Sequence, residues 1–77
     1  MTKIMYYVLH RGNTMDEGVV NIKSTTLKSM KTQLSSWVNR IKKQWKKEEG
    51  YIIDVVGGFT FNGEDYSFDN RKVQIDR

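Results

Sequence analysis

One amphipathic pattern constrains the fold of this chain more than any other feature. The hydroxyl residues at positions 24–26 are suited to cap the start of a helix, and Gly50 is suited to end it. Between these points the apolar residues recur at helical spacing and fall within an arc of about 100°. They are Leu27, Met30, Leu34, Trp37, Val38, Ile41 and Trp45. We therefore predict a helix from about Thr26 to Glu49 with a single buried side.

The residues before this helix predict a hairpin. Lys3–His10 is rich in β-branched and aromatic residues, which favours a strand. The polar segment Arg11–Gly18 predicts a loop longer than a tight turn. Val19–Lys23 then predicts a second, short strand in which Val20 and Ile22 face inward and Asn21 faces outward.

The residues after the helix predict further strands. Tyr51–Val56 is apolar except for one acid, and Gly57-Gly58 is suited to a bulge or a kink. Asn62-Gly63 is a strong signal for a two-residue hairpin turn, although a four-residue loop is an alternative. Lys72–Ile75 alternates again, and it either extends the preceding strand or forms a separate one.

Aromatic residues flank the Asn62-Gly63 turn at alternating positions. The two alternative loops differ in register by two residues, so both place the same side chains on one face of the sheet. We expect this face to pack under the helix, and a stacking surface for exposed nucleic-acid bases is the alternative. The face consists of Tyr51, Phe59, Phe61, Tyr66 and Phe68.

Together these elements predict an α+β fold in the order ββαββ. We predict a single domain over residues 1–77, with one long amphipathic helix packed across a largely antiparallel sheet of four to five strands. A β-grasp-like strand order is one arrangement of this kind. The helix would be about 35 Å long, whereas a six-residue strand spans about 20 Å. Either the last hairpin is long, or the helix end that carries Trp45 overhangs the sheet.

Composition excludes several classes of protein. The chain has no cysteine, so disulfides, thiolate catalysis and cysteine-based zinc sites are ruled out. It has no apolar run of about 20 residues and no signal-peptide layout, which predicts a cytoplasmic protein that does not enter a membrane. The absence of proline and alanine with abundant lysine, asparagine, isoleucine and tyrosine is typical of an AT-rich genome. A phage or another mobile element is the predicted source.

The sequence contains no motif that promises catalysis or a cofactor. His10 is the only histidine, and we expect it at the surface end of a strand because no nucleophile is spaced to pair with it. The oxygen-rich stretch 62–70 lacks the spacing of a calcium loop. Gly57-Gly58 lacks the flanking residues of a phosphate-binding loop. We therefore predict a non-enzymatic protein with no metal and no cofactor.

The net charge of +4 is distributed unevenly along the chain. Residues 1–17 are balanced, whereas Gly18–Lys47 contains eight basic residues and no acid. Residues 48–77 contain seven acids and three bases. Such asymmetry favours an anionic partner for the basic segment.

Most of these bases fall on the side of the predicted helix opposite the apolar stripe. Like charges three and four residues apart destabilise this helix by about 1–2 kcal/mol in total at low salt, which argues for a functional role. We predict that this side binds the phosphates of DNA or RNA with little sequence specificity. The predicted contacts are Arg40, Lys42, Lys43, Lys46, Lys47 and Lys28, with Lys31 at the margin.

The alternative prediction is a protein-binding modulator, such as an inhibitor of a host factor. Its contacts would be an exposed strand edge, the helix end at Trp45, or the hairpin tip. The tip consists of Asn62, Gly63, Glu64 and Asp65. The basic side would equally suit an acidic protein surface. Trp37 is expected in the core, and a homodimer formed through free edges is a third alternative.

Overall fold

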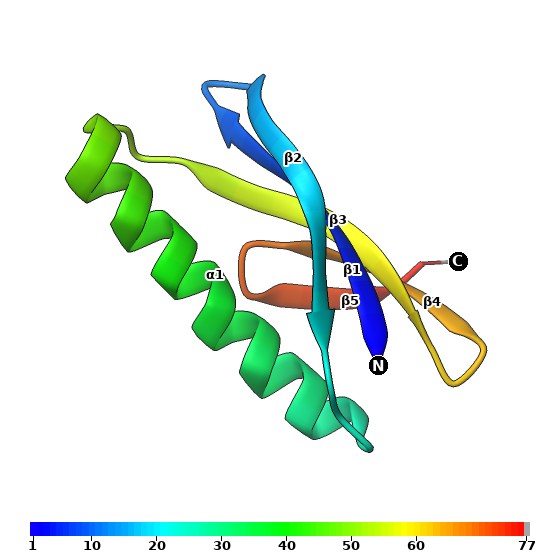
Figure 1. Cartoon of the computed structure of the whole chain (residues 1–77). Coiled ribbons are helices and arrows are strands. Elements are labelled where there is room, and N and C mark those ends of the chain that lie inside the picture. The colour runs from blue at the N-terminus through cyan, green and yellow to red at the C-terminus, as the bar shows by residue number, and fades with distance from the viewer. Residues whose placement is uncertain (77) are drawn as a thin grey trace.

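The computed structural model describes residues 1–76, and its elements follow the predicted order, with Lys72–Ile75 as a separate last strand (Figure 1). Two strands precede a single helix, and three strands follow it. The elements are β1 (Thr2–His10), β2 (Asn13–Ile22), α1 (Leu27–Glu49), β3 (Asp54–Phe61), β4 (Glu64–Asp69) and β5 (Lys72–Ile75).

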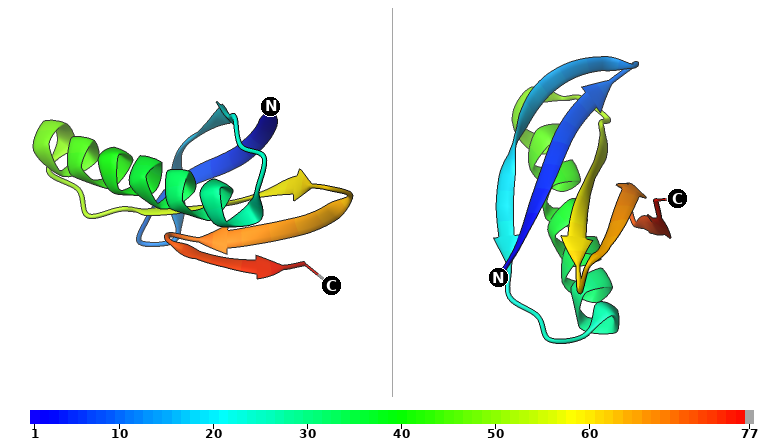
Figure 2. Two further views of the ribbon diagram at one scale, coloured as in Figure 1. Left: turned by 90° about the horizontal axis from the view of Figure 1, so that it is seen from below. Right: turned by 90° about the vertical axis from the view of Figure 1, so that its right-hand side faces the viewer.

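The five strands form one antiparallel sheet in the order β2-β1-β3-β4-β5. Helix α1 lies across one face of this sheet, and β2 and β5 are its two edges (Figure 2). The molecule is therefore a two-layer α+β domain, as predicted. The β-grasp-like order is not observed, because β1 pairs with β3 in the antiparallel sense.

Helix α1 begins and ends where its capping residues indicate. The Thr26 hydroxyl accepts a hydrogen bond from the Ser29 amide at 3.1 Å, which satisfies one of the free donors of the first turn. Gly50 has φ of 76°, and its amide donates to the Lys46 carbonyl at 3.1 Å. A left-handed glycine at this position ends the helix without the strain that a side chain would bring.

The core lies between the stripe of α1 and the inner face of the sheet. Met30, Leu34 and Val38 are fully buried from the helix side. The aromatic residues beside the Asn62-Gly63 turn are buried on the sheet side, which confirms their shared face and excludes a base-stacking surface at that point. These aromatic residues are Phe59, Phe61, Tyr66 and Phe68.

The turn between β3 and β4 has two residues. Asn62 and Gly63 have φ of 50° and 79°, and Phe59 lies opposite Tyr66. A separate β5 follows a second turn, in which Asn70 also has a positive φ of 58°. The shorter loop and the separate last strand are therefore the correct alternatives.

The predicted long loop at Arg11–Gly18 is wrong. Arg11 and Gly12 have φ of 53° and 80° and form a tight turn, so that β2 begins at Asn13. The polar residues that suggested a loop belong to a strand at the edge of the sheet, where most side chains of residues 13–17 face solvent. Polarity in this segment reflects exposure on both faces and does not mark irregular backbone.

Two predictions after the helix are also corrected. Strand β3 begins at Asp54, so Tyr51 leaves the predicted aromatic face, and Ile52 is 76% exposed. Gly57 and Gly58 lie inside β3 without a bulge. A Cβ atom on Gly57 would collide with the Met5 carbonyl oxygen, so glycine is needed there because another backbone approaches closely.

The C-terminal end of α1 does not overhang the sheet as an apolar tip. The β1–β2 hairpin is long, with nine and ten residues in its strands, and its turn reaches the same end of the molecule as the helix C-terminus (Figure 1). Trp45 is half-buried against the core, and the His10 ring stacks on Tyr51 with centroids 4.5 Å apart. The first hairpin, which the sequence predicted to be short, covers this end.

Candidate nucleic-acid interface

The predicted phosphate-binding residues all lie on α1, where Arg40 flanks the helix toward β2, Lys42 flanks it toward the β4–β5 turn, and the others are exposed to solvent. We call the set Lys28, Arg40, Lys42, Lys43, Lys46 and Lys47 the basic helix face. All of these side chains are exposed except Lys42, which is half-buried. The helix presents the apolar stripe to the sheet, and this packing leaves the opposite side in solvent.

Lys42 is the member of the basic helix face that the rest of the fold engages. Its Nζ donates to Asn70 Oδ1 at 3.2 Å, and the Val55 amide donates to the same oxygen at 3.1 Å. Asn70 Nδ2 donates in turn to Asp54 and Asp69. Lys42 therefore joins the helix to the β4–β5 turn, and it is a poorer phosphate ligand than its exposed neighbours.

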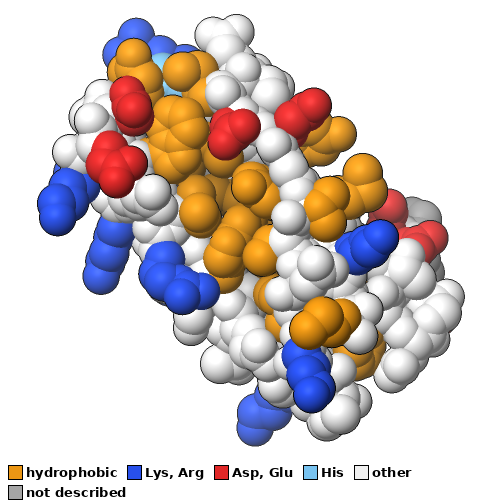
Figure 3. Space-filling view, in the orientation of Figure 1, with side chains coloured by type: hydrophobic (Ala, Val, Ile, Leu, Met, Phe, Trp, Pro, Cys, Tyr) orange, Lys and Arg blue, Asp and Glu red, His pale blue; other side chains and the backbone are white. Residues whose placement is uncertain are grey.

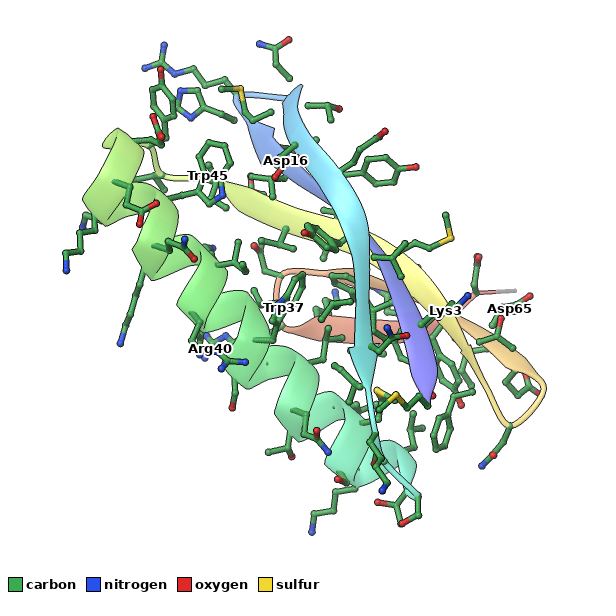
Figure 4. The ribbon with its side chains drawn as sticks, in the orientation of Figure 1. Lys3, Asp16, Trp37, Arg40, Trp45 and Asp65 are labelled. Carbon is green, nitrogen blue, oxygen red and sulfur yellow. The ribbon has the colours of Figure 1, made fainter. Side chains whose placement is uncertain are left out.

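The acidic C-terminal half of the chain does not neutralise the other cations of the basic helix face. Within residues 1–76, Lys42 is the only residue of the basic helix face whose side-chain nitrogen donates a hydrogen bond. Glu48 accepts from Gln44, at 3.4 Å, and Asp65 accepts from Thr60. Asp65, in β4, lies away from the exposed side of the helix (Figure 4), whereas Asp69, at the other end of β4, borders the hollow beside the helix and accepts a hydrogen bond from Asn70. The exposed ammonium groups thus remain available to an outside ligand.

The structure adds two bases that the sequence prediction missed. Arg71 and Lys72, at the β4–β5 turn, line an open hollow of about 690 Å³ together with helix residues such as Ser35 and Asn39. Both residues follow the end of the helix at Glu49 by more than 20 positions in the sequence, so only the tertiary fold brings them close to the helix. The sequence prediction missed Arg71 and Lys72 because residues 48–77 have a net negative charge, which favoured no cation-based site in that part of the chain.

The residues of the alternative protein-binding prediction do not form one surface. Asn62, Gly63, Glu64 and Asp65 are all exposed at the β3–β4 turn. Trp45 lies near the C-terminal end of α1, far from Asp65 (Figure 4). A single partner that used both would have to extend along the molecule, which measures 37 × 22 × 18 Å.

The remaining chemistry-bearing side chains have structural partners. The Nδ1 atom of His10 lies 3.2 Å from the Ile52 carbonyl oxygen, and Trp37 packs edge-on against Tyr6 with centroids 4.7 Å apart. Across residues 1–76, no three metal-ligating side chains gather in positions to hold an ion. No helix in this part of the chain is long and apolar enough to cross a membrane.

Comparison with protein-family models, with curated proteins and with solved structures found no match for the chain.

Proposed function

We propose that the protein binds nucleic-acid phosphates through the basic helix face, with little sequence specificity. The observation that supports this proposal is the exposure of five cations on α1, four of which lie between Arg40 and Lys47. They are Lys28, Arg40, Lys43, Lys46 and Lys47. Arg71 and Lys72 add two cations beside the helix at the β4–β5 turn, against one acid there, Asp69.

The spacing of these cations suits a phosphate backbone. Arg40 to Lys47 covers about 10 Å of helix, which is enough to meet two to four phosphates of a duplex or a single strand. Between the two basic ends of α1, the outer side carries small polar residues such as Ser36 and Asn39, which allow close approach. Ammonium groups on flexible stems act as point charges, so they neutralise phosphates without reading bases.

A salt titration of binding tests the proposal. For labelled duplex DNA and single-stranded RNA, the slope of log K against log salt concentration should be about −2 to −4. Substitution of Lys43, Lys46 and Lys47 together by glutamine should reduce the steepness of this slope by about 2–3. Lys3→Gln is the matched control, because Lys3 lies on β1 away from the helix (Figure 4).

Two results would contradict this function. One is the absence of binding to either nucleic acid at about 50 mM salt, where electrostatic binding is strong. The other is a triple glutamine variant that binds as the unmodified protein does while the Lys3 variant loses affinity. Circular dichroism of each variant establishes that the fold is intact.

A further inference from the structure

Strand β2 forms an open edge of the sheet (Figure 2). The Asn70 amide donates to the Val55 carbonyl, so Val55 turns its backbone groups to β4 and its neighbours turn theirs to β1. The same alternation continues through β1, which pairs with β3 on one side and with β2 on the other. As a result, the backbone N–H and C=O groups of Glu17, Val19 and Asn21 point away from β1. These groups form a row that another extended chain can pair with.

A groove runs between this edge and α1. It has a volume of about 440 Å³, and its walls include Val20–Lys23 from the strand and Gln33, Trp37 and Arg40 from the helix. In the space-filling view, hydrophobic side chains gather in a band between the helix and β2 (Figure 3). The edge therefore offers backbone pairing and an apolar floor at the same place.

A glycine on β2 lies close to the groove, next to the aromatic pair that supports its Trp37 wall. A Cβ atom on Gly18 would lie 2.9 Å from the Tyr6 hydroxyl oxygen, so a side chain there would displace the Tyr6 ring. Tyr6 in turn packs edge-on against Trp37. Trp37 remains half-buried in this arrangement and forms part of the wall of the groove.

The charge of the groove indicates what it binds. Its charged residues are Lys23 and Arg40, both exposed, and among residues 1–76 no acid lines it. Asp16 lies further along β2, toward the end of the molecule that carries Trp45 (Figure 4), and the register shift between Val8 and Leu9 also interrupts the edge there. The regular part of the edge thus runs from Glu17 to Ile22, and the two cations of the groove lie on its walls.

We propose that this β2 groove binds an extended peptide segment of another protein that alternates apolar and acidic residues on its helix-facing side. The segment would add a sixth, outer strand beside β2. An apolar side chain would cover Val20 and Trp37, and the next helix-facing side chain, about 7 Å further along, would place a carboxylate near Arg40 or Lys23.

The occupant is a foreign peptide rather than a second copy of the chain. A copy that paired through its own β2 in the antiparallel sense would place its helix on the same side of the combined sheet. The regular part of its edge would then present Gly18, Val20 and Ile22 on that side, and none of these residues supplies a carboxylate for Lys23 or Arg40. A nucleic acid has the required charge but no strand edge with which to pair, so it would leave the backbone groups of Val19 and Asn21 unused.

The probe for this proposal is a fluorescent peptide of about eight residues that alternates threonine with leucine and glutamate in turn. Binding is measured by anisotropy and compared with a peptide that has lysine in place of glutamate. We expect the glutamate peptide to bind at least about tenfold more tightly, because only it complements the two cations of the groove. Equal binding of the two peptides would overturn the assigned chemistry.

Two substitutions separate strand pairing from charge. Asn21→Pro removes a backbone N–H that faces away from β1, so the fold tolerates it, whereas peptide affinity should fall about tenfold or more. Asn21→Ala is the control and should bind within about twofold of the unmodified protein. Arg40→Glu should also weaken binding about tenfold, since it removes the charge-assisted contact. Unchanged binding by the proline variant would refute strand addition.

The test is independent of nucleic-acid binding. Lys47→Glu, on the basic helix face and outside the groove, should weaken DNA binding and leave the peptide affinity unchanged. Asn21→Pro should do the opposite. If peptide and DNA compete and both substitutions weaken both ligands equally, the groove is part of the nucleic-acid site and the proposal fails. If light scattering shows a dimer that Asn21→Pro abolishes, a second copy occupies the edge and the proposal fails as well.

Discussion

The two sides of α1 differ in what they contribute to the protein. On the side that faces the sheet, Met30, Leu34 and Val38 are fully buried, and their packing holds the helix against the sheet. The opposite side carries like charges three and four residues apart, which slightly destabilise the helix. The comparison teaches that the same helix is optimised for packing on one side only, and that its other side is free to serve a ligand.

The largest expected effect comes from the buried side. Leu34→Ala should lower the free energy of unfolding by about 2–5 kcal/mol, because it removes a fully buried side chain and leaves a cavity. Ser36→Ala, on the exposed side of the same helix, should change it by less than about 0.5 kcal/mol. Urea denaturation measures both. Similar losses for the two variants would mean that the two sides of α1 are not distinct.

A smaller loss of stability is expected at Asn70, which joins α1 to the β4–β5 turn through Lys42. Asn70→Ala should cost about 2–4 kcal/mol of stability, because it frees the Val55 amide and Lys42 and strains a residue with φ of 58°. Asn70→Gly relieves the backbone strain but not the lost hydrogen bonds, so it should recover only about 1 kcal/mol. A glycine variant as stable as the unmodified protein would show that the hydrogen bonds of Asn70 contribute nothing.

The N-terminus of α1 offers a more moderate test. Thr26→Ala should cost about 1 kcal/mol, because the Ser29 amide loses its side-chain acceptor. Thr26→Ser retains the hydroxyl and should stay within about 0.3 kcal/mol of the unmodified protein. Thermal unfolding followed by circular dichroism distinguishes the two. An alanine variant that melts with the serine variant would remove Thr26 as the cap.

The smallest effect on stability should accompany a clear effect on binding. Lys43→Glu converts repulsion with its helical neighbours into attraction, so the free energy of unfolding should stay equal or rise by up to about 0.5 kcal/mol. The same change should weaken DNA binding and reduce the steepness of the salt dependence by about 1. A large loss of stability would instead assign Lys43 a structural role.

Much of the fold was predictable because its signals are local. The helix ends followed from the Thr26 hydroxyl and the left-handed preference of Gly50, and the aromatic face followed from the alternation on both sides of Asn62-Gly63. The polar strand Asn13–Glu17 was missed because exposure on an edge and disorder in a loop produce the same composition. Arg11-Gly12 was the signal that could have placed the tight turn.

The candidate site was predictable in part for the same reason. Helical period places Arg40, Lys43 and Lys47 on one side of α1 whatever the rest of the chain does. The addition of Arg71 and Lys72, the engagement of Lys42 by Asn70, and the groove beside β2 depend on contacts between distant segments.

By itself, the sequence determined which residues form the helix, where that helix begins and ends, and which of its sides is charged, because backbone preferences and side-chain period act over a few residues. Only the tertiary structure decided which strand pairs with β1 on the side opposite β2, which lysine of the helix is hydrogen-bonded to the rest of the fold, and which strand is left at the edge of the sheet. Those outcomes depend on how the whole chain buries its apolar surface at once, and strands of similar composition can satisfy that demand in more than one order.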